Sequence, residues 1–229
     1  MTKQRLSKVL AAAGVASRRA AETYITKGRV TVNGTTVLIP QTPVDPKVDQ
    51  IKVDGKKIAA APSKLYFALH KPVGYYCTMD ARIKRRAVDL VEAPKGVRLF
   101  TVGRLDRMTS GLLLVTNDGH FANRVMHPSG EIRKEYIAKV NHEITHEHLV
   151  ALSEGCVVQG VRVKPVRVSK IRRSTVRIVV QEGRRHEVRE MLEAVGLTVI
   201  ELKRVKVGEL SLGSLPVGKF KPISPEDVL

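Results

Sequence analysis

One acidic residue stands between two arginines in a short loop near the middle of the chain. Residues 103–109 read GRLDRMT, so Asp106 lies between Arg104 and Arg107. A carboxylate can serve as a nucleophile or as a general base. Either role requires an ionised carboxylate at neutral pH, which burial opposes and a nearby arginine favours. The pattern indicates either a catalytic carboxylate or a structural ion pair within the loop.

Two apolar segments hold this loop between them. Residues 99–102 (LFTV) and 112–115 (LLLV) have the length of buried strands, and the second is followed by the turn sequence NDG at 117–119. Loops held by a rigid scaffold are common places for chemistry. The strands are therefore expected to fix the position of Asp106.

The chain of 229 residues carries a large positive charge. Lys and Arg number 40 against 22 acids, which gives a net charge of +18 and an isoelectric point near 10.2. Such an excess is typical of proteins with a polyanionic partner, which leaves RNA, DNA and an anionic membrane surface. No apolar run approaches the roughly 18 residues of a membrane span, and no secretory signal is recognisable. Cys77 and Cys156 have no spaced partners, which argues against a metal site or disulfides and favours a reducing compartment.

The first sixty residues predict two short helices and two hairpins. Apolar residues at helical spacing predict a helix over 6–13, and Ser17 is a suitable N-cap for a second helix over 18–27. Asn33-Gly34 and Asp54-Gly55 are strong hairpin signals. Seven cations against one acid in residues 1–34 indicate either a solvated surface or a surface that grips phosphates.

The remaining sequence alternates strand and helix patterns. A patternless stretch at 59–63 places a domain boundary there, giving residues 1–62 and 63–229. Strands are predicted over 65–70, 134–140 and 175–180, a hairpin through Val161, Val163, Val166 and Val168, and helices over 120–127, 145–153 and 188–195.

Two motifs resemble a known family. Residues 103–119 (GRLDRMTSGLLLVTNDG) are similar to the signature of the RsuA/RluB family of ribosomal-RNA pseudouridine synthases, and residues 182–189 (EGRRHEVR) resemble its EGR-x-x-[QE]-V-[RK] segment. The resemblance implies that Asp106 is the catalytic aspartate and that Arg189 pairs with it. It also implies that Tyr136 stacks on the target base and helps a late proton removal. Without the family resemblance, Tyr136 would be read as an ordinary sheet residue and Arg189 as an ordinary residue of a helix surface.

The first domain resembles the small RNA-binding domain named after ribosomal protein S4, through its segment LSKVLAAAGVASRRAAETYITKGRVTVNG. Together the two resemblances imply an α+β protein with a small N-terminal, helix-rich RNA-binding domain and a mixed, largely antiparallel, curved-sheet catalytic domain. The predicted RNA-binding residues are Arg18, Arg19, Lys27, Arg29, Lys71, Arg104, Arg184 and Arg185.

The implied activity is isomerisation of a specific uridine in ribosomal RNA to pseudouridine. The base is detached from ribose C1′, rotated and rejoined through C5, which requires no cofactor and no metal. Asp106 would either attack the sugar or remove a ribose proton to give a glycal, and the family resemblance favours the glycal route. Glu187 favours the RluB-like, large-subunit branch over the small-subunit branch. The expected partner is ribosomal RNA, free or within a pre-ribosomal particle, with no membrane and a monomeric protein. The expected location is the bacterial cytoplasm or an organelle.

Two other functions remain to be weighed. A non-catalytic RNA-binding or ribosome-assembly protein explains the charge equally well but not the carboxylate in a basic loop. A glycoside or nucleoside hydrolase needs two facing carboxylates, and Asp118 is the nearest second one. The position of Asp118 before Gly119 indicates a turn instead.

Overall fold

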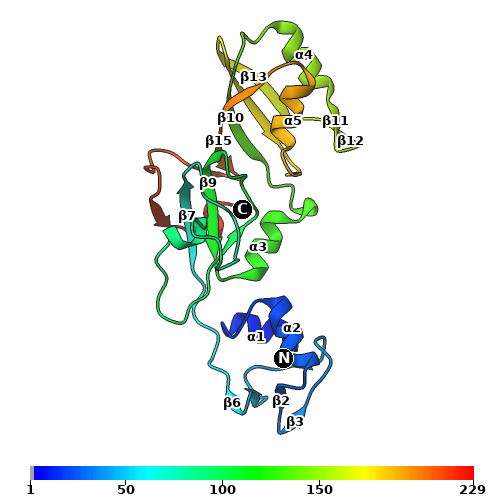
Figure 1. Cartoon of the computed structure of the whole chain (residues 1–229), viewed down its shortest axis with the longest axis vertical. Helices are drawn as coiled ribbons and strands as arrows, with labels where there is room; N and C mark the ends of the chain where they lie inside the picture. The colour runs from blue at the N-terminus through cyan, green and yellow to red at the C-terminus, as the bar shows by residue number, and fades with distance from the viewer. Residues whose placement is uncertain (1–2) are drawn as a thin grey trace. The chain divides into compact units, whose positions relative to one another are not determined.

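The computed structural model describes residues 3–229, and the chain divides into two compact units (Figure 1). One comprises the chain up to Lys64 together with Ala93–Arg98, and the other comprises Leu65–Glu92 and Leu99–Leu229. The division expected from the sequence, 1–62 and 63–229, places residues 93–98 in the second domain. The domain boundaries themselves stay a prediction.

The first unit packs two short helices on small sheets. Helix α1 (Leu6–Ala12) and helix α2 (Arg18–Thr26) bury Leu6, Leu10 and Ile25. The Ser17 hydroxyl accepts a hydrogen bond from the Ala20 amide at 3.1 Å, so the predicted N-cap is confirmed. The strands are β1 (Gln4–Arg5) paired with β4 (Pro43–Val44), and a four-stranded sheet in the order β3 (Thr35–Thr36), β2 (Val30–Val32), β5 (Ile51–Val53) and β6 (Lys56–Lys57).

Both predicted hairpins of this unit are confirmed. Asn33 and Asp54 adopt positive φ angles of 53° and 50°, and each is followed by a glycine that also has a positive φ. These conformations give the tight turns that join β2 to β3 and β5 to β6.

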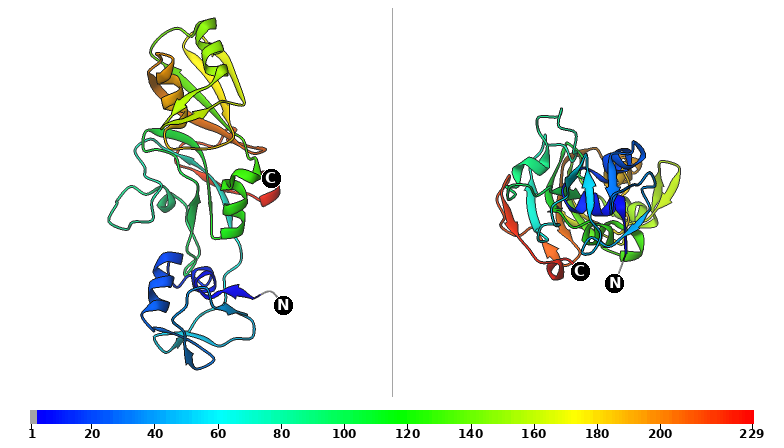
Figure 2. Two further views of the ribbon diagram at one scale, coloured as in Figure 1. Left: turned by 90° about the vertical axis from the view of Figure 1, so that its right-hand side faces the viewer. Right: turned by 90° about the horizontal axis from the view of Figure 1, so that it is seen from below.

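The second unit is built on a nine-stranded, twisted sheet (Figure 2). Its main path runs in the order β13 (Arg167–Arg172), β14 (Thr175–Val180), β10 (Lys134–Val140), β15 (Val199–Val207), β9 (Thr109–Thr116), β7 (Tyr66–Lys71) and β17 (Phe220–Pro222), with β16 (Leu210–Ser211) on β15 and β8 (Phe100–Val102) on β9. Every pairing is antiparallel except that of β15 with β9. The largely antiparallel α+β architecture is therefore confirmed.

Helices cover parts of this sheet. Helix α4 (His146–Glu154) packs on β13 and helix α5 (Glu187–Ala194) on β15, at the end of the sheet drawn uppermost in Figure 1. Helix α3 (Gly119–Met126) packs on β8. Short 3-10 helices occur at Ala87–Leu90, Pro128–Gly130 and Pro225–Asp227.

Strand β9 is the central strand of the core. Leu112, Leu113 and Leu114 are fully or almost fully buried because the sheet and its coverings bury both faces of the strand. The strand begins at Thr109, three residues before the apolar run predicted as a strand, so the loop that carries Asp106 is shorter than the sequence suggests.

The sequence misplaced one hairpin. Strand β12 (Val161–Val163) pairs back onto β11 (Cys156–Val158), while β13 pairs forward onto β14. The predicted hairpin through Val161–Val168 is wrong because Gln159 and Gly160, both at positive φ, form the turn earlier.

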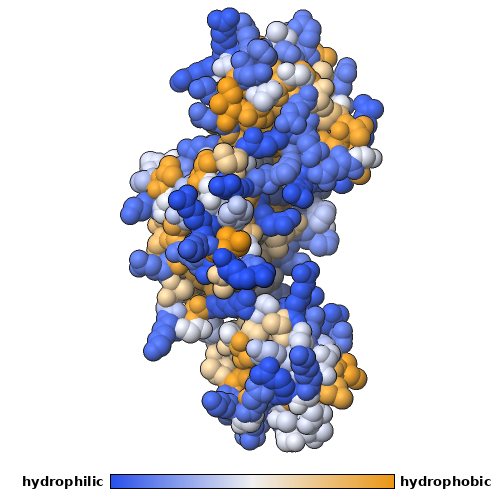
Figure 3. Space-filling model, viewed as in Figure 1, coloured by the Kyte–Doolittle hydropathy of each residue, from blue (hydrophilic) through white to orange (hydrophobic). Residues whose placement is uncertain are grey.

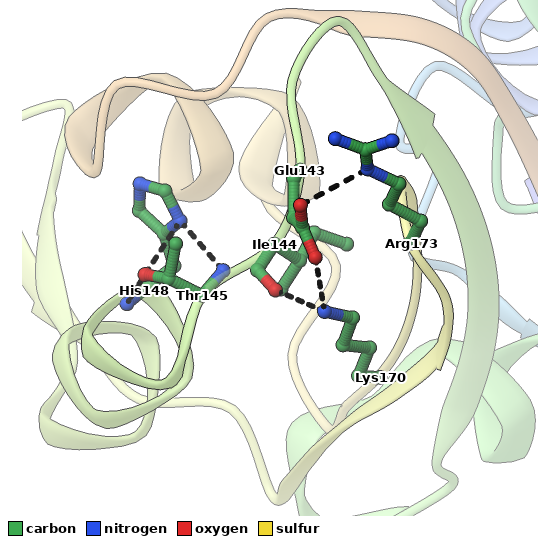
Figure 4. A network of polar contacts seen from close by, with 6 residues as sticks. All are labelled: Glu143, Ile144, Thr145, His148, Lys170 and Arg173. Carbon is green, nitrogen blue, oxygen red and sulfur yellow. Dashed lines mark hydrogen bonds and ion pairs between the residues drawn. The ribbon is translucent and has the colours of Figure 1, made fainter.

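A polar network far along the chain from the Asp106 loop joins the approach to α4 with the β13–β14 hairpin (Figure 4). Glu143 pairs with Lys170 at 3.3 Å and with Arg173 at 3.0 Å, and Lys170 also donates to the carbonyl of Ile144. These two cations hold the pKa of Glu143 below its usual value. Such exposed pairs orient a loop more than they stabilise a fold.

The surface is mixed in polarity. On the face drawn in Figure 3, hydrophobic residues form separate patches among hydrophilic ones. Within residues 3–229, none of the helices combines the length and the apolar character needed to cross a membrane.

Candidate active site

A cleft of about 940 Å³ opens on the second unit. It is lined by the β8–β9 loop, by strands β10 and β15, by the segment after β14 and by the segment after β7. The predicted site residues that line it are Arg104, Asp106, Tyr136, Arg184 and Arg185. Folding therefore gathers into one cavity residues that lie as many as 81 positions apart.

Asp106 presents its carboxylate to this cleft. The side chain is 34% exposed, and its Oδ1 lies 3.3 Å from Nε2 of His186. At this distance the imidazole is in polar contact with the carboxylate. His186 has a positive φ of 57°, which histidine tolerates better than most residues, and this backbone bend turns the chain into α5. The contact holds the carboxylate at the cleft surface.

Arg189 does not occupy the place that the family resemblance implies. Its guanidinium donates from Nη2 to the carbonyl oxygen of Met108 at 3.0 Å. Among the described residues, the ion-pair partner of the Asp106 carboxylate is His186. The physical reason is position along the helix. Arg189 lies on α5 about one turn after the bend at His186, and its side chain reaches Met108 at the end of the loop instead of the Asp106 carboxylate. The predicted Arg189–Asp106 pair is corrected accordingly.

Lys71 was expected among the RNA-binding residues, and the structure contradicts that expectation. Its side chain has no exposed surface, because β7 carries it beneath the Asp106 loop. The ammonium donates to the carbonyl oxygens of Pro72 at 3.0 Å, Asp106 at 3.1 Å and Thr109 at 2.8 Å, with a longer contact to Arg107 at 3.5 Å. Burial lowers the pKa of Lys71 to about 8. Lys71 therefore fixes the loop from below and cannot touch RNA.

The segment 181–187 is fixed in a similar way on the opposite wall. Lys134 donates to the carbonyls of Gln181 at 2.9 Å and Glu182 at 2.8 Å, and burial lowers its pKa. Glu187, which is buried, accepts from the amide of Arg184 at 3.0 Å, and burial raises the pKa of its carboxyl. The wall that carries His186 is thus held by strand β10 and by the first turn of α5.

Three fully or partly buried cations in or beneath the cleft are satisfied by backbone carbonyls. Lys71 and Lys134 bind the carbonyls given above, and Arg204 of β15, only 6% exposed, donates to the carbonyl of Leu112 at 2.8 Å. A carbonyl neutralises no charge, so the cleft keeps a positive potential. Such a cleft attracts a phosphate backbone.

Exposed cations lie at the rim of the cleft and on the surface of the first unit. Arg104, Arg184 and Arg185 are exposed, and Arg184 pairs with Glu182 at 2.6 Å. On the first unit Arg18, Arg19 and Lys27 are exposed.

Arg29 is exposed but already engaged within the first unit. It is held by Asp54 at 2.9 Å and lies over the ring of Tyr24, 4.1 Å from its centroid. It is therefore the least available of the four predicted RNA contacts on this unit.

Asp118 does not complete a pair of catalytic carboxylates. It caps α3 by accepting from the His120 amide at 2.9 Å, and it also accepts from the Tyr66 hydroxyl at 2.9 Å. It is absent from the lining of the cleft. Among the described residues no cluster of three or more His, Cys, Asp or Glu side chains suits a metal ion.

Four residues line the cleft although no sequence pattern assigns them to the site: His186, Cys77, Lys134 and Arg204. His186 was visible within the second motif, next to Glu187, but neighbouring arginines were a more obvious choice for contact with an acid. Nothing in the local sequence pattern pointed to Arg204, because its strand β15 was not predicted.

Comparison with known proteins matches both parts of the chain to known families. Residues 65–194 match the RNA pseudouridylate synthase family and residues 4–50 match the S4 domain. The chain is 40% identical to the ribosomal large subunit pseudouridine synthase B of Bacillus subtilis, over 98% of this chain and 94% of that protein. It is 49% identical to a putative chloroplastic ribosomal large subunit pseudouridine synthase of Arabidopsis thaliana, over 98% of this chain and 60% of that protein. A crystal structure of a pseudouridylate synthase is 28% identical, with a TM-score of 0.71 over 98% of this chain and 97% of that one.

Proposed function

Because the chain belongs to the RNA pseudouridylate synthase family and carries an S4 domain, we propose that it isomerises a specific uridine of ribosomal RNA with Asp106 as the catalytic carboxylate. The observation that carries this proposal is the Asp106 carboxylate at the surface of a large cleft whose inner cations, Lys134 and Arg204, are bound to backbone carbonyls. A non-catalytic RNA-binding protein has no need for an accessible carboxylate in such a cleft.

The chemistry is an isomerisation, and no co-reactant enters it. The bond from ribose C1′ to uracil N1 breaks, the base rotates, and C1′ joins C5, whose proton is released. Asp106 either attacks C1′ or removes a ribose proton to give a glycal, and we favour the glycal route. The contact between the His186 imidazole and the carboxylate, 3.3 Å from Nε2 to Oδ1, helps to orient Asp106 for this step.

The target uridine must leave its stack before it reaches Asp106. Flipping costs a few kcal/mol, and less in loops. Tyr136 lines the cleft from β10, and stacking of a base on it returns roughly 1–3 kcal/mol. Exposed Arg104, beside Asp106, is suited to hold the flipped nucleotide by its phosphate.

We place the target in large-subunit ribosomal RNA. The names of the relatives from Bacillus subtilis and Arabidopsis thaliana support this choice, as does Glu187. The RNA is bound free or within a pre-ribosomal particle, by a monomer, in a bacterial cytoplasm or an organelle.

Release of tritium from ribosomal RNA labelled at uridine C5 tests the proposal. The protein should release tritium, and Asp106→Asn should abolish release, while Glu201→Gln, an exposed carboxylate outside the cleft lining, should behave as the wild type. Mapping pseudouridine in RNA from cells with and without the protein identifies the uridine. Absence of release would support a binding protein, and free uracil would support a hydrolase.

A further inference from the structure

Tyr76 is the exposed aromatic side chain of the protein. The sequence has four Phe, five Tyr and no Trp, all within the described residues, and of these only Tyr76 is exposed, at 40%. Five of the others are engaged inside the units: Tyr66 with Phe121 and Phe67 with Phe220 form edge-to-face pairs, and Tyr24 supports Arg29. Exposing an aromatic ring to water is unfavourable, and a ligand that stacks on the ring would bury that apolar surface.

The ring lies on the wall of the cleft that contains Asp106. The guanidinium of Arg107, which follows Asp106 directly, sits 5.5 Å from the centroid of the Tyr76 ring. One side of the ring is therefore next to a cation. The ring can stack on a nucleobase while the guanidinium of Arg107 binds the phosphate of the same nucleotide.

Hydrogen bonds join the segment around Tyr76 to the catalytic loop both before and after Tyr76 in the chain. The amide of Gly74 donates to the carbonyl of Arg107 at 2.8 Å, and Sγ of Cys77 accepts from the amide of Leu105 at 3.3 Å. The distance between the Tyr76 backbone and the Asp106 loop is therefore set by hydrogen bonds and does not depend on a flexible loop.

A second loop holds the same backbone from the other side. The Tyr76 amide donates to the Arg85 carbonyl at 2.8 Å, and the Ala87 amide donates to the Tyr76 carbonyl at 2.8 Å. This loop carries exposed Lys84 and Arg85. The backbone that carries the ring is thus held between the catalytic loop and a cationic loop, where a nucleic-acid backbone would pass.

We propose that Tyr76 is a stacking platform for a nucleobase that flanks the target uridine. Single-stranded bases are commonly recognised by stacking on aromatic side chains. Tyr136, buried in the cleft, takes the flipped uridine, and Tyr76 at the rim takes a neighbour and thereby sets the register of the RNA relative to Asp106. This inference rests on the proposed function, because it assumes an RNA substrate in this cleft.

The test compares Tyr76→Phe, which keeps the aromatic face, with Tyr76→Leu, which removes it. The probe is an in vitro transcript of large-subunit ribosomal RNA. Binding is measured at several salt concentrations in the Asp106→Asn background, and turnover is measured by tritium release in the native background. We expect Tyr76→Leu to weaken binding about tenfold, within the range measured for loss of one stacked base. It should raise KM by a similar factor with little change in kcat, and Tyr76→Phe should match the wild type.

The salt dependence separates stacking from phosphate contact. Loss of a stacked base should weaken binding equally at every salt concentration, whereas the control Lys84→Gln should make the dependence on salt shallower. The proposal is overturned if Tyr76→Leu binds like the wild type, if Tyr76→Phe loses as much as Tyr76→Leu, or if Tyr76→Leu changes the salt slope. Should Tyr76→Leu melt below the wild type, Tyr76→Met replaces it in the same comparison.

Failure of the two proposals can be told apart. If the transcript binds with the expected Tyr76 pattern but no tritium is released, the stacking platform stands and the isomerase assignment fails. If tritium is released and Tyr76→Leu has wild-type affinity and KM, the isomerase assignment stands and the platform fails.

Discussion

The Nε2 atom of His186 lies 3.3 Å from Oδ1 of Asp106, although the two residues are eighty positions apart in the chain. The contact joins the β8–β9 loop to the start of α5 across the cleft. It depends on the positive φ of His186, since an ordinary helical φ at this position would turn the ring elsewhere.

Replacement of His186 should therefore reduce turnover without unfolding the protein. Asparagine also tolerates a positive φ, so His186→Asn keeps the backbone bend but shortens the side chain. We expect kcat/KM to fall roughly tenfold, which corresponds to about 1.4 kcal/mol of transition-state stabilisation. Tritium release measures the loss, and an unchanged melting temperature shows that the fold persists. Wild-type activity in His186→Asn would show that the contact has no catalytic consequence.

Replacement of Lys71 should damage the fold and the activity together. Lys71→Met would leave the carbonyls of Pro72, Asp106 and Thr109 without their buried donor. Because an unsatisfied buried acceptor costs ~1–3 kcal/mol, we expect the free energy of unfolding to fall by about 3 kcal/mol. Urea denaturation measures this, with exposed Lys139→Met as the control. Equal stability of the two variants would contradict the role assigned to Lys71.

The lowered pKa of Lys71 predicts a specific pH dependence. Its pKa is about 8 in the folded protein and 10.5 in the unfolded chain, so between these values the unfolded state binds more protons. The Lys71 contribution should therefore make the free energy of unfolding rise with pH across this window. Activity should fall over the same window, because a neutral amine has fewer N–H donors for the loop carbonyls. Parallel pH series of urea denaturation and kcat test this. A stability series with the same slope in wild type and Lys71→Met would refute the assignment.

The hydroxyl and the ring of Tyr136 should have separable effects. Tyr136→Phe keeps the stacking surface, so KM should change little, while kcat should fall by about 10²-fold if the hydroxyl assists proton removal. Tyr136→Leu should also raise KM. Steady-state tritium release distinguishes the two parameters, and Tyr24→Phe on the first unit serves as the control. If Tyr136→Phe has wild-type kcat, the hydroxyl takes no part in proton transfer.

The cations of the first unit should contribute affinity and not chemistry. Replacing Arg18, Arg19 and Lys27 by glutamine should weaken binding to ribosomal RNA at low salt and make the plot of log affinity against log salt shallower by about 2–3. The value of kcat at saturating RNA should persist. Filter binding at several salt concentrations measures this, and Lys47→Gln, an exposed cation of the same unit, is the control. An unchanged salt slope would show that these residues do not contact phosphates.

Local patterns in the sequence determined most of the secondary structure. The cap at Ser17, the turns at Asn33 and Asp54, and the apolar run of β9 were predictable because each depends on neighbours within a few residues. The hairpin after α4 was misplaced, because alternating valines fit more than one pairing and the turn at Gln159 and Gly160 lacks a strong signal. Strand β15 was missed although it joins the two halves of the sheet.

The sequence alone determined the chemistry available to this protein: a carboxylate in a basic loop, a strongly cationic chain, and motifs similar to those of one family. Only the tertiary structure decided which side chain meets the Asp106 carboxylate, because that choice depends on the bend at His186 and on the direction in which α5 leaves it. Burial likewise decided that Lys71 supports the loop while Tyr76 remains at the rim. These outcomes arise from contacts between residues distant in the chain, and residue types and spacing do not specify such contacts.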